Sequence, residues 1–301
     1  MRRIIGWGLA LVLVAVLAAA AYVWLSITGY FVHKRTPAEL LALLEPDIVI
    51  SKPDGAGPFP AILLYSGCEG LFRDDKRLAL MGIYSDLAVA EGVVAIVVDS
   101  FTPRGIGYET AVGDVCSGWL LRGAERAGDV AVTIPFARDL PYVDPERLAV
   151  AGWSHGGWTV MDFLAMPPDA LVPQSLTEWP EDPFAGLTSV YLTYPYCGMN
   201  ASGFPTLAPS RGFAEPLPVW AIHGTADTTA DPVPCHEAYA RVLAEGAPVD
   251  TATIEGATHA FDRPDVDPAS TSKYNPEFAE IAYRRFRHFL RDVLIPGREG
   301  F

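Results

Sequence analysis

One short segment of the sequence pairs a potential nucleophile with the backbone geometry that would expose it. Ser154 lies in Gly152-Trp153-Ser154-His155-Gly156-Gly157, directly after an apolar run and directly before an amphipathic one. A strand that turns sharply into a helix lifts a serine hydroxyl above the sheet, and small neighbours are needed because the backbones crowd there. A chance Gly-rich turn is the alternative. The strand before and the helix after favour acyl transfer through Ser154.

A serine hydroxyl is a weak nucleophile unless a base takes its proton, so a histidine must reach it. His259 lies in Gly256-Ala257-Thr258-His259-Ala260-Phe261, just past the last expected strand, where a loop could carry the imidazole over the sheet. An ordinary surface histidine is the alternative. The remaining histidines lie beside the apolar N-terminal run, in the turn itself, or at the ends or interior of expected elements: His33, His155, His223, His236 and His288. We therefore expect His259 to be the base.

The base in turn needs a carboxylate that orients it and stabilises the imidazolium. Asp227 ends the segment His223-Gly224-Thr225-Ala226-Asp227, which leaves a short buried strand at 219–222. Asp231, four residues on, is the rival, and Asp262 is a more remote one. We favour Asp227 because its turn leaves the strand directly.

Acyl transfer also requires N–H donors for the negative charge that develops on the carbonyl oxygen. The backbone N–H of His155 is one expected donor, because it follows the nucleophile. The loop Tyr65-Ser66-Gly67-Cys68-Glu69-Gly70 follows an early strand, which makes the Cys68 N–H the second. A simple Gly-rich turn is the alternative for this loop.

The elements that must position these residues alternate along the chain. Expected strands are 47–50, 61–65, 93–98, 148–152, 189–193, 219–222 and 251–254. Expected helices are 37–44, 76–91, 122–138, 155–166, 235–243 and 276–294. This order predicts an α/β fold, a mostly parallel doubly wound sheet covered by helices on both faces, with its site at the strands' carboxyl ends. The Pro-rich segment 167–187 is either a lid or a surface excursion.

Several of these motifs together resemble the dienelactone hydrolase family over residues 47–294. They are the turn with Trp153 and His155, the 66–70 loop, Asp99-Ser100-Phe101-Thr102-Pro103-Arg104-Gly105, Asp227 and His259. The resemblance implies the α/β-hydrolase fold, whose order of nucleophile, acid and base is matched here. Dienelactone hydrolase itself uses a cysteine nucleophile where this chain has Ser154, and many relatives carry His-Gly in place of Ser66-Gly67.

Two charged residues and the cysteines gain possible roles from this fold. Glu69 could influence the chemistry of the site, or it could be a solvated charge at its rim. Arg104 could bind a substrate carboxylate, or it could pair with a structural carboxylate. The four cysteines alone permit three pairings. On the implied fold, their positions after strands favour two bridges, Cys68–Cys116 and Cys197–Cys235.

The N-terminal run 4–25 is apolar or small throughout and, as a helix, is long enough to cross a membrane. A cleaved signal peptide is the alternative. We expect an anchor or signal at 1–32, a linker at 33–46 and the catalytic domain at 47–301. Basic residues before the run predict a domain outside the cytoplasm, periplasmic or extracellular, whether it is anchored or secreted after cleavage.

Charge and composition limit the possible partners. The net charge of −14, without a basic and aromatic cluster, argues against nucleic-acid binding. No close set of metal ligands and no phosphate loop is evident, so no cofactor or metal is expected. The sequence leaves the oligomeric state open.

The combined motifs predict a serine hydrolase that cleaves a small-molecule ester or lactone. Alternatives are an acyltransferase, an inactive membrane-tethered binding protein of hydrolase fold, and a peptidase of the prolyl-oligopeptidase kind. Such peptidases usually add a propeller domain, for which this sequence offers no segment.

Overall fold

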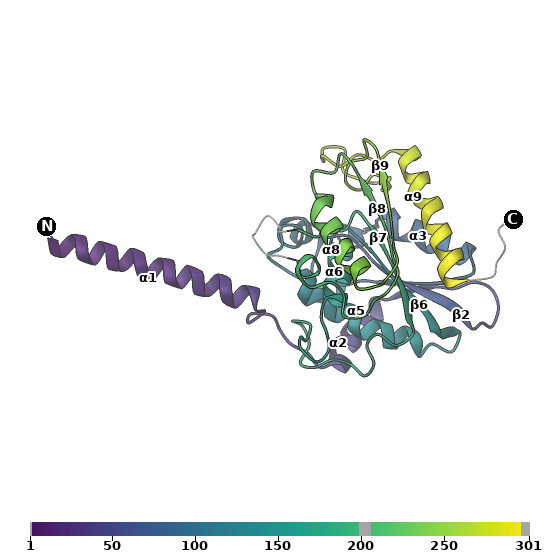
Figure 1. Cartoon of the computed structure of the whole chain (residues 1–301), viewed down its shortest axis with the longest axis horizontal. Coiled ribbons are helices and arrows are strands. Elements are labelled where there is room, and N and C mark those ends of the chain that lie inside the picture. The colour runs from purple at the N-terminus through teal and green to yellow at the C-terminus, as the bar shows by residue number, and fades with distance from the viewer. Residues whose placement is uncertain (1, 199–205, 296–301) are drawn as a thin grey trace.

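A seven-stranded sheet forms the centre of the protein (Figure 1). The computed structural model describes residues 2–198 and 206–295. The strand order is β1-β5-β2-β6-β7-β8-β9, in which β1 is antiparallel to β5 and the other neighbours are parallel. The strands are β1 Val49–Ser51, β2 Phe59–Tyr65, β5 Val94–Val98, β6 Val143–Trp153, β7 Leu187–Thr193, β8 Val219–Gly224 and β9 Val249–Ile254.

Helices cover both faces of this sheet, as the alternating pattern predicts (Figure 1). One face carries α2 Pro37–Leu44, α5 Gly123–Arg138, α6 His155–Leu164, α7 Ala208–Arg211 and α8 Pro232–Ala244. The other face carries α3 Ala79–Ala90 and α9 Pro276–Phe289. The remaining helical segments are α1 Arg2–Ile27, α4 Tyr108–Thr110, η1 Glu45–Asp47, η2 Thr102–Arg104, η3 Ala111–Val115 and η4 Leu290–Leu294.

The sheet holds together because its central strands bury apolar side chains on both faces. Along β2, Leu63 and Tyr65 pack with the cluster under α5, whereas Ile62 and Leu64 pack with the cluster under α3 and α9. Successive side chains of a strand point to opposite faces, so a strand buried on both sides is a continuous apolar run. The α/β fold expected from these runs is confirmed.

The start of α3 differs from the prediction. Residues 76 and 77, assigned to a helix, instead form β4 (Lys76–Arg77), which pairs with β3 (Phe72–Arg73) in a hairpin. Asp74 makes the turn with φ +52°, a conformation that aspartate tolerates better than most residues. The helix therefore begins only at Ala79.

The segment expected to be a linker contributes to the core. Thr36 and Glu39 form a capping box that starts α2. Leu40 and Leu44 of this helix are fully buried and belong to the cluster that α5 also enters. Burial of two leucines stabilises the fold by roughly 1.5–3 kcal/mol each.

The N-terminal apolar run forms α1, which extends away from the sheet (Figure 1). Within the residues that the structure describes, no helix combines the length and the apolar character that a membrane crossing requires. The predicted transmembrane helix is therefore unsupported.

Candidate active site

Ser154 occupies the turn between β6 and α6 in a strained backbone conformation. Its φ is +53° and its ψ is −115°, a region that residues with a side chain rarely adopt. The neighbouring glycines make the turn possible. A Cβ on Gly156 would collide with the carbonyl oxygen of Tyr65, and one on Gly152 would collide with the backbone of Gly156. The sequence expectation that small residues flank a crowded serine is therefore met.

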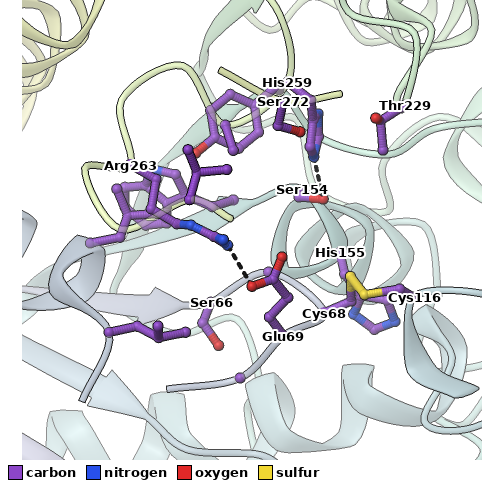
Figure 2. Close-up of a pocket in the computed structure, with 18 of the residues that line it drawn as sticks. Ser66, Cys68, Glu69, Cys116, Ser154, His155, Thr229, His259, Arg263 and Ser272 are labelled. Atoms are coloured by element: carbon purple, nitrogen blue, oxygen red, sulfur yellow. Dashed lines mark hydrogen bonds and ion pairs between the residues drawn. A yellow bond between two sulfur atoms is a disulfide. The ribbon is translucent and has the colours of Figure 1, made fainter. Parts of the chain in front are cut away.

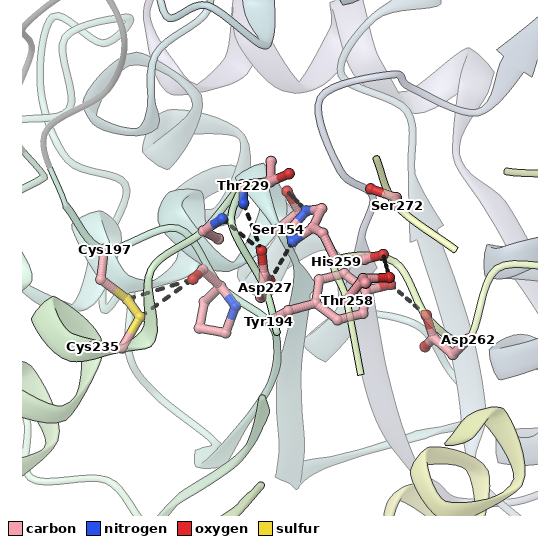
Figure 3. A network of polar contacts seen from close by, with 12 residues as sticks. Ser154, Tyr194, Cys197, Asp227, Thr229, Cys235, Thr258, His259, Asp262 and Ser272 are labelled. Carbon is pink, nitrogen blue, oxygen red and sulfur yellow. Dashed lines mark hydrogen bonds and ion pairs between the residues drawn. A yellow bond between two sulfur atoms is a disulfide. The ribbon is translucent and has the colours of Figure 1, made fainter. Parts of the chain in front are cut away.

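The structure brings Ser154, His259 and Asp227 into one line of hydrogen bonds (Figures 2 and 3). His259 Nε2 lies 2.8 Å from Ser154 Oγ, and His259 Nδ1 lies 2.7 Å from Asp227 Oδ2. Because a carboxylate only accepts, Nδ1 carries the proton and Nε2 is free to accept the serine proton. The other oxygen of Asp227 accepts the backbone N–H groups of Thr229 and Ala230, both at 2.8 Å. These bonds hold the carboxylate toward the imidazole.

The two rival carboxylates have other partners. Asp231 caps α8 by accepting the N–H of Val233 at 2.9 Å. Asp262 is fully buried and accepts the hydroxyls of Tyr84 at 2.6 Å and Tyr194 at 2.5 Å. Burial raises the pKa of the Asp262 carboxyl. Neither rival is hydrogen-bonded to His259 in the part of the chain that the structure describes.

The loop after β2 lies against Ser154, where the second oxyanion donor is expected. A Cβ on Gly67 would lie 3.5 Å from the Cβ of Ser154, so the loop backbone passes close to the serine. Cys68 and His155 both line the same cavity (Figure 2). Cys68 is also tied by a disulfide to Cys116, with 5.0 Å between their Cα atoms. The second bridge joins Cys197 and Cys235, so both expected pairs are confirmed.

A cavity of about 360 Å³ opens over Ser154, within the usual size range of small-molecule sites. Polar groups gather around the serine, and apolar side chains form much of the remaining wall: Leu71, Leu78, Leu80, Met81, Trp158, Tyr194 and Val266. No residue of 167–187 lines this cavity among those that the structure describes.

Glu69 lies in the cavity wall, but Arg104 does not. Glu69 pairs with Arg263 across the cavity at 2.9 Å (Figure 2). Sequence reasoning missed Arg263, although it lies four residues after His259 in the same loop. Arg104 instead forms a two-pronged ion pair with Asp129, at 2.6 and 3.1 Å, which is the structural alternative weighed for it.

The family of this chain is shown by a sequence match that includes all three hydrogen-bonded residues of the site. A model of the prolyl oligopeptidase family matches residues 116–281, more than half of the chain, with Ser154, Asp227 and His259 inside the match. The chain belongs to the prolyl oligopeptidase family. A probable dipeptidyl-aminopeptidase B of Fusarium vanettenii is 38% identical to this chain over 100 residues. The aligned part is 33% of this chain and 10% of that relative.

Solved structures share the fold of this prolyl oligopeptidase family member. Esterase 2 of Thermogutta terrifontis, phosphorylated by paraoxon, is 18% identical, with a TM-score of 0.59 over 81% of this chain and 88% of that one. A putative dienelactone hydrolase of Klebsiella pneumoniae is 17% identical, with a TM-score of 0.54 over 79% and 96%. At these identities the likeness establishes the fold alone. The expected α/β-hydrolase fold is confirmed, in agreement with the resemblance to dienelactone hydrolases.

Proposed function

We propose that the chain is a serine hydrolase that cleaves a small carboxylic ester or lactone through an acyl-enzyme on Ser154. The observation that carries this proposal is the line of two hydrogen bonds from Asp227 through His259 to Ser154. The cavity above the serine supports a small substrate with an apolar part, because its wall is rich in leucine, methionine and aromatic side chains.

In the proposed reaction, His259 Nε2 takes the hydroxyl proton while Ser154 Oγ attacks the carbonyl carbon. The N–H groups of Cys68 and His155 stabilise the oxyanion. The intermediate collapses as the C–O bond breaks, and the leaving alkoxide takes the proton from His259. Water, deprotonated by the same nitrogen, then attacks the acyl carbon. The bond between that carbon and Ser154 Oγ breaks, the acid is released, and Ser154 Oγ takes the proton back from His259. Asp227 holds the imidazole in the required tautomer throughout.

Peptidase activity is the second candidate, and family membership and the aminopeptidase relative favour it. An amide is cleaved by the same steps, except that an amine leaves. The two candidates differ in the ratio of kcat/KM values for p-nitrophenyl butyrate and for dipeptidyl p-nitroanilides. A higher value on the anilides would replace the ester proposal.

Paraoxon tests the nucleophile directly, because it phosphorylates the esterase of similar fold. We expect the full chain to gain one diethylphosphoryl group on Ser154 by mass spectrometry and to lose p-nitrophenyl butyrate turnover. Ser154→Ala and His259→Ala should abolish turnover, and Ser154→Ala should also abolish labelling. A folded wild-type chain that neither labels nor hydrolyses ester or anilide would support the non-catalytic binding protein instead.

We further infer that this domain works outside the cytoplasm, in the periplasm or the extracellular space. Two disulfides support this location, Cys68–Cys116 and Cys197–Cys235, because such bridges persist in oxidising compartments. Fractionation of cells followed by thiol alkylation tests it. Recovery of the chain with four free thiols in the cytosolic fraction would contradict it.

A further inference from the structure

A buried arginine lies behind the loop that carries Cys68. Arg126, in α5, is 0% exposed. Its Nη1 donates to the carbonyl oxygen of Ser66 at 2.8 Å, and its Nε donates to Ser100 Oγ at 2.8 Å. The guanidinium carbon lies 4.9 Å from the centre of the Phe101 ring, which adds a cation–π contact. The side chain is therefore held on several sides.

The same guanidinium also reaches the residue that follows the nucleophile. Arg126 Nη1 lies 3.2 Å from His155 Nδ1. Burial, together with the charge of Arg126, holds the pKa of His155 well below its usual value. His155 is therefore neutral at pH 7, and its Nδ1 accepts the hydrogen bond because a guanidinium can only donate. Figure 2 places Ser66 and His155 on the side of the cavity away from His259.

Arg126 remains charged despite its burial. Burial lowers its pKa to about 10, still far above neutral pH. Asp129 and Asp99 offset part of this burial effect, whereas the nearby Arg104 adds to it. A planar, charged guanidinium at this position can donate hydrogen bonds in fixed directions to two partners at once. A lysine, with its single nitrogen, does this less well.

We propose that Arg126 is a positioning residue of the oxyanion hole. One guanidinium joins the Ser66 carbonyl, two residues before the Cys68 N–H, to the ring of His155, whose own N–H is the other donor. It thereby sets the separation and direction of two N–H groups that come from loops far apart in the sequence. This role rests on the hydrolase function proposed above.

The test compares catalysis with affinity for an oxyanion mimic. Benzeneboronic acid adds to a catalytic serine as a tetrahedral anion, so its Ki reports the oxyanion hole rather than ground-state binding. For Arg126→Met in the full chain we expect kcat on p-nitrophenyl butyrate to fall about 10²-fold, in the range of one lost oxyanion donor. KM should change little, and the boronic acid Ki should rise in proportion to the loss in kcat/KM. Arg126→Lys should restore part of both.

Thr133→Val is the matched control on the same helix. Its hydroxyl bonds Tyr65 Oη at 2.7 Å, so the variant loses a buried hydrogen bond near the loop without releasing Ser66. We expect it to lower the melting temperature and to leave kcat and the boronic acid Ki unchanged. Equal loss of kcat in Thr133→Val and Arg126→Met, or a loss without a change in Ki, would overturn the inference.

Arg126→Met could also fail to fold, since a buried cation is removed. Ser100→Ala then tests the proposal, because it removes the hydrogen bond to Arg126 Nε and keeps the charge of the guanidinium. We expect kcat to fall several-fold with a parallel rise in the boronic acid Ki, and unchanged values of both would overturn the proposal. If Ser154→Ala keeps full turnover, the hydrolase proposal itself fails. If Ser154→Ala is inactive while the Arg126 and Ser100 variants match wild type, the positioning role alone fails.

Discussion

At the scale of single residues, the two oxygens of Asp227 have separate tasks. One accepts two backbone N–H groups, and the other accepts the His259 ring N–H. The carboxylate thus faces the imidazole without any contribution from substrate. An amide in its place would present a different set of donors and acceptors to the ring.

We predict that Asp227→Asn lowers kcat by roughly 10³- to 10⁴-fold with little loss of stability, because the imidazole is left in the wrong tautomer. Ester turnover at saturating substrate is the measurement. Asp231→Asn is the matched control, because asparagine caps a helix as well as aspartate does and should keep wild-type kcat. A large loss in Asp231→Asn with none in Asp227→Asn would reverse our assignment.

At the scale of elements, each disulfide attaches a loop at the carboxyl end of the sheet to a distant segment. Cys68–Cys116 attaches the loop after β2 to the segment that follows η3. Cys197–Cys235 attaches the segment after β7 to α8. The bridges span 48 and 38 residues, so loop-closure entropy predicts about 4 kcal/mol of stabilisation for each.

This similarity makes the second bridge a control for the first. We predict that Cys68→Ala with Cys116→Ala lowers kcat about tenfold, because the proposed donor at position 68 loses its tether. Cys197→Ala with Cys235→Ala should lower the free energy of unfolding about as much as Cys68→Ala with Cys116→Ala does, but should retain most of kcat. Urea denaturation and ester kinetics on both double variants provide the measurements. Equal losses of kcat in the two double variants would mean that the effect comes from lower overall stability and not from the loop that carries position 68.

Much of this architecture could be predicted from the sequence because buried parallel strands are apolar runs. The seven expected strands correspond to the seven strands of the main sheet. Ser154, Asp227 and His259, expected to act together at the carboxyl ends of strands, are joined by hydrogen bonds. Arg126 and Arg263 could not be predicted this way. An arginine that faces the core looks in sequence like one that faces solvent, and their contacts cross large sequence separations.

At the scale of the whole molecule, a buried histidine couples stability to pH. His223 lies at the end of β8, with its Nε2 3.2 Å from the hydroxyl of Tyr239. Burial, with a smaller effect from His236, lowers the pKa of His223 to about 4 from its usual 6.5. The unfolded chain therefore binds a proton between these two values, and the native state does not.

We predict that the free energy of unfolding has its full value above pH 6.5 and falls as the pH drops toward 4, by on the order of 3 kcal/mol from this group. His223→Gln keeps a partner for Tyr239 and should flatten this part of the curve. Urea unfolding from pH 4 to 7 is the measurement. His288→Gln alters a histidine whose side chain is 70% exposed and should keep the wild-type slope, so a flattened curve there would count against the assignment.

The positive φ of Ser154 has a consequence for selection as well as for chemistry. A serine at +53° carries strain that glycine does not, typically 1–3 kcal/mol for such conformations. Ser154→Gly should therefore melt roughly 2–4 °C above Ser154→Ala by calorimetry, although both are inactive. Activity and stability make opposite demands at this one position. A lineage released from hydrolysis would be expected to drift toward glycine there.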